Sequence, residues 1–531
     1  MQRRHFLALG GSSLGAALAA PRLAGAQGRG QGSRTLRFIP HADLAVLDPV
    51  FSAAYVTRNH AYLVYDTLFG QDAAMTPQPQ MVEGVLQDDD GRRWTLTLRE
   101  GLRFHDGTPV LARDCVASIR RWGQKDDLGK ALLGITEELA APDDRRIVFR
   151  LRQPYPLLPF ALGKTPGTVC AVMPARIAET PVDRAVTEVV GSGPFRFLAD
   201  ERVAGDRVAY ARFEAYVPRS GGRAEGTAGP KVAHFDRIEW KTISDAATAA
   251  AALRTGEVDW WELPSNDMLP LFRGDQGFKV EQLDPTGYMV SLRVNHVQGP
   301  TANPAIRRAL MAAMSQRDVV MAIAGTDPAL WNDRVGFFCP GTPMANETGM
   351  EALRGDQAAA RKALEAAGYK GEKLLLMTPA DVQLNAAGSA VVADTLRRSG
   401  VNVDEATMDW GTLLQRRNRK DPIEQGGWSA YVVLNTGADL GSPAVHPNLR
   451  GDGRSGLYGW CESPALEALR TEWLAAPDPV SQLALAKRMQ GQAFQDLPYL
   501  PLGQVVQLTA YRAGLSGMLQ GVPVFWNLRR G

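Results

Sequence analysis

Apolar and polar residues alternate in three short segments within the first third of the chain. Because successive side chains of a strand point to opposite faces, this period of two predicts three strands, each packing one face against a core. The alternating apolar positions are Leu36 and Phe38, then Trp94, Leu96 and Leu98, then Ile147, Phe149 and Leu151.

A different spacing marks helices further along. Asn303-Pro304 pairs a capping residue with proline at the first helical position. Asp356 predicts the start of a second helix that Gly368 ends, and Asp114 is predicted to cap an earlier helix. The intermixing of strands and helices predicts α/β layering. After Asn303-Pro304, the apolar residues recur on one helix face, at Ile306, Ala309, Leu310, Ala313 and Met314.

The N-terminal segment has the pattern of an export signal. Arg3 and Arg4 precede an apolar run rich in Gly and Ala, and Ala24-Gly25-Ala26 fits a cleavage site, so residues 1–26 are predicted to be a signal peptide. The Arg3-Arg4 pair followed by Phe6-Leu7 favours twin-arginine export, with an ordinary Sec signal as the alternative. Residues 27–33 are predicted to be a flexible leader.

The chain length and the net charge limit the possible domain organisation and partners of the protein. A chain of 531 residues is expected to form at least two domains. Loss of Arg3, Arg4 and Arg22 with the signal would change the formal net charge from +2 to −1, so nucleic acid is not an expected partner. No later apolar stretch is long enough to predict a membrane span. The Gly-rich segment from Pro218 to Pro230 predicts an exposed loop of no special function.

Local signatures of catalysis or cofactor binding are missing from the predicted mature chain. The seven histidines are scattered, the four cysteines are not in C-x-x-C spacing, and no Walker A run occurs. The only G-x-S-x-G run, residues 11–15, lies inside the predicted signal. No metal, no cofactor and no enzymatic activity are therefore expected.

Six segments, in order, resemble the extracellular solute-binding proteins of the peptide/nickel (dipeptide- and oligopeptide-binding) family, family 5. Together they extend over the predicted mature chain. They are Trp94 to Val110, Val190-Gly191-Ser192-Gly193-Pro194-Phe195, Leu253 to Asp259, Asn303 to Leu310, Ala360 to Tyr369, and Leu497 to Leu502.

The resemblance implies an α/β fold of two lobes joined by a hinge, the type II (cluster C-like) periplasmic-binding-protein fold with an extra subdomain in lobe one. Lobe one would comprise 34–283 and the C-terminal return 504–531, and lobe two would comprise 284–503. Placing Cys339 and Cys461 together in lobe two makes them the preferred disulfide pair, and four buried free thiols are the alternative.

The resemblance also implies function. The chain would be the periplasmic receptor of an ABC importer, a monomer that captures a small peptide or peptide-like solute and docks on membrane permease subunits. Nickel as a bare ion is not expected, since the sequence has no histidine cluster. An exported hydrolase and a ligand sensor without transport are the alternatives. The candidate ligand contacts are Trp428, Asp439, Tyr431, Arg334, Trp460, Phe338 and Tyr288. A core position is the alternative for the aromatic members and is favoured for Trp460, Phe338 and Tyr288.

One departure bears on the ligand. Dipeptide binders of the family carry a Trp-Thr-x-Asp run whose carboxylate meets the amino group of the peptide, whereas Trp428-Ser429-Ala430-Tyr431 places Tyr there. Asp439 is the predicted substitute for that carboxylate, because a buried ammonium without a partner is costly. Arg334 is the predicted partner of a ligand carboxylate.

Overall fold

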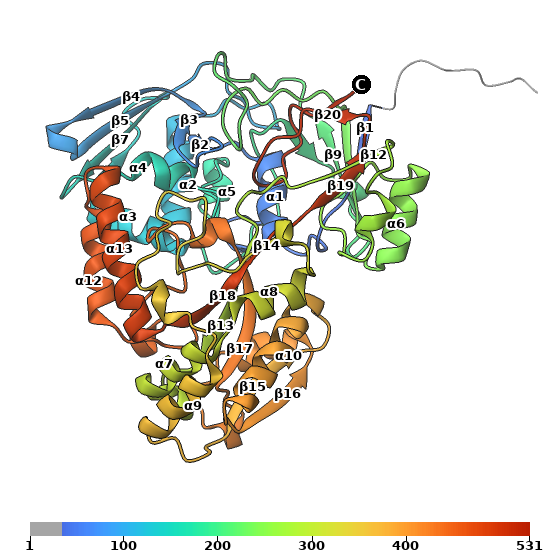
Figure 1. Cartoon of the computed structure of the whole chain (residues 1–531). Coiled ribbons are helices and arrows are strands. Elements are labelled where there is room, and N and C mark those ends of the chain that lie inside the picture. The colour runs from blue at the N-terminus through green and yellow to red at the C-terminus, as the bar shows by residue number, and fades with distance from the viewer. Residues whose placement is uncertain (1–33) are drawn as a thin grey trace, which may run out of the picture.

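The structure is a computed structural model that describes residues 34–531. The predicted signal peptide at 1–26 and the predicted leader at 27–33 lie outside the described residues. Two lobes are stacked along the long direction of Figure 1, and each is built around its own mixed sheet. Within the described part of the chain, no helix combines the length and the apolar character needed to cross a membrane.

Lobe one contains a seven-stranded sheet that gathers segments from both ends of the chain. Strand β1 lies inside the sheet and pairs in parallel with β10 and β11, while the other pairings are antiparallel. The C-terminal Phe525 returns to this sheet, its ring 5.0 Å from that of Phe38. The order is β12 (Phe278–Glu281), β19 (Thr509–Arg512), β11 (Trp260–Trp261), β1 (Thr35–Ile39), β10 (Arg237–Lys241), β9 (Arg207–Arg212) and β8 (Phe195–Phe197).

A four-stranded antiparallel sheet stands beside it, at the upper left of Figure 1. Its apolar alternation is the one seen in the sequence, since Trp94, Leu96 and Leu98 of β5 and Ile147 and Phe149 of β7 are buried. The predicted strands are thus confirmed. The order is β4 (Val82–Asp88), β5 (Arg93–Leu98), β7 (Arg146–Leu151) and β6 (Thr136–Ala140), and two short pairs are β2 (Phe69–Gln71) with β3 (Pro77–Pro79) and β20 (Leu515–Ser516) with β21 (Arg529–Arg530).

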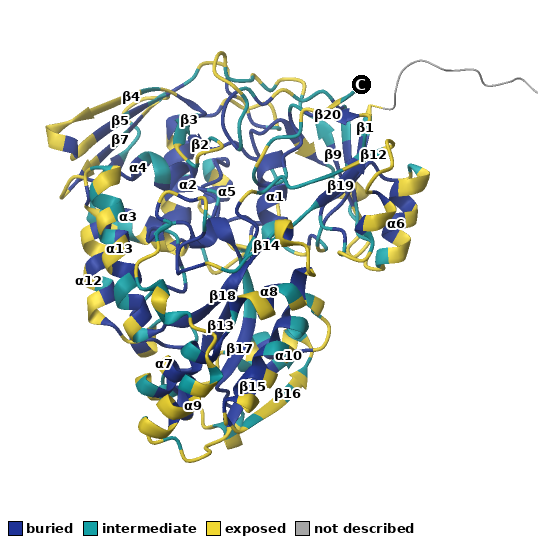
Figure 2. Ribbon diagram, in the orientation of Figure 1, coloured by how far each residue is buried: buried dark blue, intermediate teal, exposed yellow. Residues whose placement is uncertain are grey.

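Lobe two contains a six-stranded mixed sheet. Its inner strands are mostly buried, while the edge strand β16 and the outer faces of its helices are exposed, as Figure 2 shows. The order is β14 (Trp331–Asn332), β18 (Tyr499–Val505), β13 (Tyr288–Val294), β17 (Ala430–Thr436), β15 (Leu374–Pro379) and β16 (Val403–Met408).

Two of the three predicted helix caps are found in the structure. Asn303 caps α7 and Asp356 caps α9, as predicted. Asp114 is not the cap of α2 but its third residue, where the carboxylate accepts hydrogen bonds from the backbone of Leu111 at 2.9 Å and of Ala175 at 2.8 Å. The helices of lobe one are α1 (Tyr55–Val64), α2 (Ala112–Lys125), α3 (Asp127–Ile135), α4 (Leu158–Gly163), α5 (Ala175–Ala178) and α6 (Ala246–Thr255). Those after β13 are α7 (Pro304–Ala313), α8 (Gln316–Ala324), α9 (Gln357–Ala366), α10 (Gln383–Arg398), α11 (Trp410–Arg416), α12 (Pro464–Leu474) and α13 (Pro479–Asp496).

Two neighbouring connections carry the chain between the sheets. One runs from β12 to β13 and the other from β18 to β19, and these strands are paired on both sides of the crossing. Gly287, directly before β13, has a φ of +53°, and a Cβ there would lie 2.4 Å from the carbonyl oxygen of Val505. Two adjacent antiparallel crossings of this kind are suited to act as a hinge. The predicted lobe limits at 283/284 and 503/504 stay a prediction and fall near these connections.

Candidate functional site

A narrow cleft lies between the lobes beside the two connections. Lobe one contributes Tyr55, Arg58 and Glu262 to its lining, and lobe two contributes Tyr288 and Thr436. The cavity here measures about 60 Å³. Sites that hold drug-sized ligands measure roughly 300–1,000 Å³, so the lobes must separate before a ligand of that size enters.

A second cavity of about 50 Å³ continues the cleft, and Asp284, Gly521 and Val522 line both cavities. The backbone N–H of Gly521 donates to the carbonyl of Leu283 at 2.9 Å, which holds the C-terminal segment across the cleft. Gly226 and Thr227 also line the second cavity, and Thr227 is buried. The segment Pro218 to Pro230 is therefore exposed only in part, because its last residues fold inward against Gln71, whose carbonyl accepts from the Thr227 N–H at 2.9 Å.

Tyr55 joins the two lobes across this cleft. Its hydroxyl donates to Oδ2 of Asp439 at 2.6 Å and accepts from the backbone N–H of Thr436 at 3.1 Å. Tyr55 is the first residue of α1 in lobe one, whereas Thr436 ends β17 and Asp439 lies in the following turn, η8 (Gly437–Leu440). Burial and the neighbouring Asp439 carboxylate raise the pKa of Tyr55, so its hydroxyl keeps the proton that it donates.

Glu262 is held on the lobe-one side by three donors. Its Oε2 accepts from the backbone N–H of His41 at 2.7 Å and from the His41 ring at 2.8 Å, and its Oε1 accepts from Asn59 at 3.1 Å. Burial opposes ionisation, but His41 and Arg58 outweigh it and lower the pKa of Glu262. The site thus contains a buried, ionised carboxylate. Across residues 34–531, no group of three or more His, Cys, Asp or Glu side chains is arranged to hold a metal ion.

Arg58 is the cation of this cleft. It lies one turn into α1 from Tyr55, and its guanidinium stacks over the Tyr55 ring with the central carbon 4.9 Å from the ring centroid. The side chain is buried, and its Nε has no hydrogen-bond partner.

Asp284 lies in the connection between the lobes. Its Oδ1 accepts from the backbone N–H of Thr286 at 2.9 Å and from the Thr286 hydroxyl at 2.6 Å. Because Asp284 lines both cavities, it brings a carboxylate to the middle of the cleft.

Of the seven residues predicted to bind ligand, two lie at this cleft. Tyr288 lines the first cavity, its ring 6.5 Å from that of Tyr55, and Asp439 bonds Tyr55. Arg334 lies elsewhere, with 70% of its side chain exposed, 3.6 Å from Glu347. The structure therefore brings together only Tyr288 and Asp439.

The other four predicted residues are aromatic and buried within lobe two. Trp428 packs against Tyr431 and Trp460, with ring centroids 5.3 Å and 5.9 Å apart, and Phe338 packs against His446 at 6.0 Å. None of the four lines either cavity of the cleft. In this arrangement they occupy the core, the alternative that the sequence left open, and a contact with ligand stays a prediction.

The predicted disulfide is wrong. All four cysteines are free and buried, which was the alternative. Cys339 lies at the hinge, where its Sγ accepts from Gln504 at 3.4 Å, whereas Cys461 lies beside Arg307 and Asp496. The two thiols occupy separate surroundings, and burial raises the pKa of each to about 12.

Four residues of the cleft were not predicted from the sequence: Tyr55, Arg58, Glu262 and Asp284. They come from three distant segments, so no local motif joins them. One signal was available for Arg58, since it stands in Val56-Thr57-Arg58-Asn59-His60-Ala61-Tyr62-Leu63, a helix that buries every one of these residues. A charged residue on the buried face of a helix calls for a partner.

The two-lobed fold and its hinge-side cleft define a solute-binding protein. Comparison with known sequences gives the family: the model for bacterial extracellular solute-binding proteins, family 5 (middle), matches residues 76–452. The chain belongs to this family, and the resemblance seen in the six motifs is confirmed.

Individual relatives agree with this assignment. The chain is 36% identical over 532 residues to a probable peptide ABC transporter periplasmic-binding protein of Sinorhizobium fredii, covering 99% of each chain. It is 24% identical over 492 residues to a glutathione-binding protein of Shigella flexneri, covering 90% of each. Among solved structures, the periplasmic binding protein DppA of Helicobacter pylori in complex with the peptide STSA superposes with a TM-score of 0.77 at 20% identity, covering 93% of this chain and 98% of that one. The last likeness confirms the predicted two-lobed fold.

Proposed function

We propose that this protein is the receptor subunit of an ABC importer, which captures a small peptide or peptide-like organic solute between its lobes and delivers it to a membrane permease. The observation that carries the proposal is the Tyr55 bridge, because it closes two hinged lobes over a cleft lined with ionised groups. A receptor of this kind binds ligand when open and presents the closed form to its permease. The names of the Sinorhizobium and Shigella relatives support a peptide-like ligand.

The ligand's ammonium would bind on the lobe-two side. Asp439 uses Oδ2 for Tyr55, while its Oδ1 has no hydrogen-bond partner among residues 34–531. Asp284 likewise has an oxygen free, since both of its hydrogen bonds from Thr286 go to Oδ1. A carboxylate with one oxygen fixed and the other open is suited to orient an ammonium group. Tyr288 would supply the apolar wall between them.

Scattering and uptake test this proposal. A mixed pool of unblocked three-residue peptides should reduce the radius of gyration of the wild-type protein and raise its melting temperature, because binding stabilises the closed form. Deletion of the gene should abolish uptake of the same pool, and restoring it should recover uptake. Closure without any effect of the deletion on uptake would instead indicate a sensor, and the absence of both closure and stabilisation would overturn peptide-like import.

The remaining features follow from the receptor role. The protein would be a periplasmic monomer without catalytic activity. This part of the proposal is supported by the family and the relatives named above, which are binding proteins. Replacing Arg3 and Arg4 together with lysine should retain the precursor in the cytoplasm if export uses the twin-arginine route. Export unaffected by that change but blocked by inhibition of the Sec machinery would establish the alternative signal.

A further inference from the structure

Arg58 has no partner for its charge within the described residues. Only 5% of the residue is exposed, yet its guanidinium makes no ion pair and no hydrogen bond with any residue of 34–531. Taking a cation out of water without a compensating anion is expensive, so buried charges are normally paired. The stack on Tyr55 offsets a part of this cost and fixes the plane of the guanidinium.

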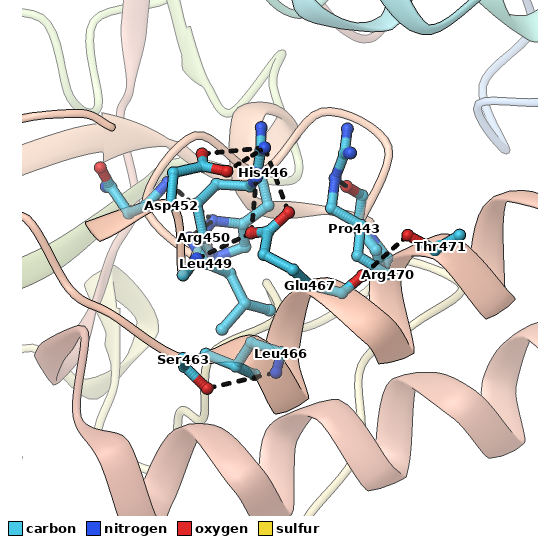
Figure 3. Close-up of polar contacts among 12 residues, drawn as sticks. Pro443, His446, Leu449, Arg450, Asp452, Ser463, Leu466, Glu467, Arg470 and Thr471 are labelled. Atoms are coloured by element: carbon cyan, nitrogen blue, oxygen red, sulfur yellow. Dashed lines mark hydrogen bonds and ion pairs between the residues drawn. The ribbon is translucent and has the colours of Figure 1, made fainter. Parts of the chain in front are cut away.

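Other buried arginines of the chain follow the usual rule. Arg121 pairs with Asp48 at 2.8 Å, and Arg307 donates to the backbone carbonyls of Thr301 and Asp496 at 2.8 and 3.0 Å. Figure 3 shows the same pattern in lobe two, where Arg450 bonds Glu467 and Asp452, and Arg470 donates to the carbonyl of Pro443. The missing partner of Arg58 is therefore a local feature of the cleft.

The acids around the cleft do not supply that partner. Both oxygens of Glu262 are occupied by His41 and Asn59. Asp284 and Asp439 each keep one oxygen open, but neither forms an ion pair or a hydrogen bond with Arg58. Arg58 nevertheless lowers the pKa of Glu262, so its charge reaches this cavity. A buried guanidinium that lines the cavity, without bonding the other lining residues, is positioned to bind an anionic group of the ligand.

We propose that Arg58 binds a carboxylate of the transported solute, an inference that rests on the proposed receptor function. A guanidinium presents paired N–H donors that match the two oxygens of a carboxylate. A multiply charged phosphate would instead meet Glu262, Asp284 and Asp439 around the same cleft, so a singly charged carboxylate on a zwitterion suits this site better. The Tyr55 ring stacks against Arg58, and the Tyr55 hydroxyl bonds Asp439 of lobe two. A carboxylate bound by Arg58 therefore lies where the two lobes close.

The experiment compares two peptide pools on three variants. Unblocked three-residue peptides and the same pool with C-terminal carboxamides are equilibrated with protein by dialysis, and retained species are measured by mass spectrometry. Wild type should retain the free acids and bind the amides about 30-fold more weakly, or weaker still. This factor corresponds to the lower end of the cost of truncating one partner of a buried charge pair. Arg58→Met should bind the free acids more weakly than wild type by a similar factor. Arg58→Lys should have an intermediate affinity, because lysine keeps the charge but lacks the paired N–H donors of the guanidinium.

Arg334→Met is the matched control, since its side chain is exposed and was the carboxylate partner that the sequence suggested. It should retain the free acids as wild type does. Equal retention of acids and amides by wild type, or undiminished retention by Arg58→Met, would overturn the inference while leaving the receptor function in place. Retention of neither pool by wild type would overturn the proposed function, and the role of Arg58 with it.

A stability measurement separates loss of binding from loss of fold. Removing Arg58 relieves its desolvation cost but also withdraws the charge that favours ionised Glu262, so the ligand-free Arg58→Met protein should melt close to the wild-type temperature. A lower melting temperature together with unchanged retention would show that Arg58 serves the structure, and would likewise overturn the inference.

Discussion

The hydroxyl of Tyr55 is a single group on which closure of the lobes depends. In Tyr55→Phe, the hydrogen bonds to Asp439 and from Thr436 are lost while the ring that supports Arg58 remains. Since Asp439 is buried, we expect the free energy of unfolding to fall by about 1–3 kcal/mol, as for a charged hydrogen bond that leaves its partner unsatisfied. Urea unfolding gives the energy, and solution scattering should show a larger radius of gyration.

Tyr288→Phe is the control for this change. The Tyr288 ring lines the same cavity, but its hydroxyl makes no hydrogen bond with another described residue. The variant should therefore unfold within about 0.5 kcal/mol of wild type, the range of substitutions that remove no specific interaction. If the two variants behave alike, the Tyr55 bridge does not hold the lobes together.

The cysteines give a second prediction for single residues. All four are buried free thiols, and burial raises the pKa of Cys339 and Cys461 to about 12, which suppresses the reactive thiolate. Ellman's reagent should titrate almost no thiol in native protein and all four in urea without reductant. Fewer than four reactive thiols in urea would show that a disulfide forms. A lower melting temperature in the presence of reductant would also indicate a disulfide.

Sequence reasoning could not separate core from site among the aromatic residues of lobe two. Trp428 and Tyr288 carry the same signal in sequence, a large amphipathic ring near a turn, yet one is fully buried beside Trp460 and the other lines the cleft. The difference depends on which segment covers each ring, a contact between residues far apart in the chain. Arg58 was missed for the related reason that its neighbours Glu262 and Asp284 are more than 200 positions away.

At the scale of elements, one buried ion pair fastens the Gly-rich segment to lobe one. Lys231 Nζ lies 2.8 Å from Asp66 Oδ1 and 4.7 Å from the centroid of the Trp526 ring, and both charged side chains are at most 1% exposed. Lys231→Met should lower the free energy of unfolding by about 3–5 kcal/mol, because it leaves a buried carboxylate uncompensated. Urea unfolding measures the loss, and limited proteolysis should cut within 218–230 sooner.

A second substitution tests the cause of that loss. Adding Asp66→Asn to Lys231→Met removes the stranded charge and should recover a large part of the stability. Arg223→Met is the control within the same segment, since the Arg223 side chain is 86% exposed. It should change stability by less than about 0.5 kcal/mol. No recovery in the double variant would mean that packing of the Lys231 chain, rather than charge, holds the segment.

Elements whose signal is local were predictable, and those set by distant contacts were not. The strands at β5 and β7 follow from alternation because one face of each is buried, and α7 and α9 begin at the predicted caps. Asp114 was predicted as a cap but lies inside α2, where its carboxylate bonds the backbone of Leu111 and that of Ala175 from a distant segment. The partly buried end of the Gly-rich segment likewise depends on Gln71 and Asp66, which no local pattern reveals.

At the scale of the whole molecule, the histidines couple stability to pH. Burial lowers the pKa of His60, His296 and His446 to about 3 and of His105 to about 4. The unfolded chain titrates near 6.5, so below that pH it binds protons that the folded chain does not. Stability is therefore fully present above about pH 6.5 and is lost as the pH falls toward the folded values, by up to about 1.4 kcal/mol per pH unit for each histidine.

Urea unfolding at pH 7.5, 6.5 and 5.5 measures this slope in a window above the titration of ordinary carboxylates. His446→Gln should lower stability at every pH, because the ring bonds Phe337 and Leu449, but it should also make the slope shallower by about one proton. His234→Gln is the control, since that histidine is only half-buried and its substitution should alter the slope far less. A slope near zero in wild type would show that the buried rings accept protons in the folded state.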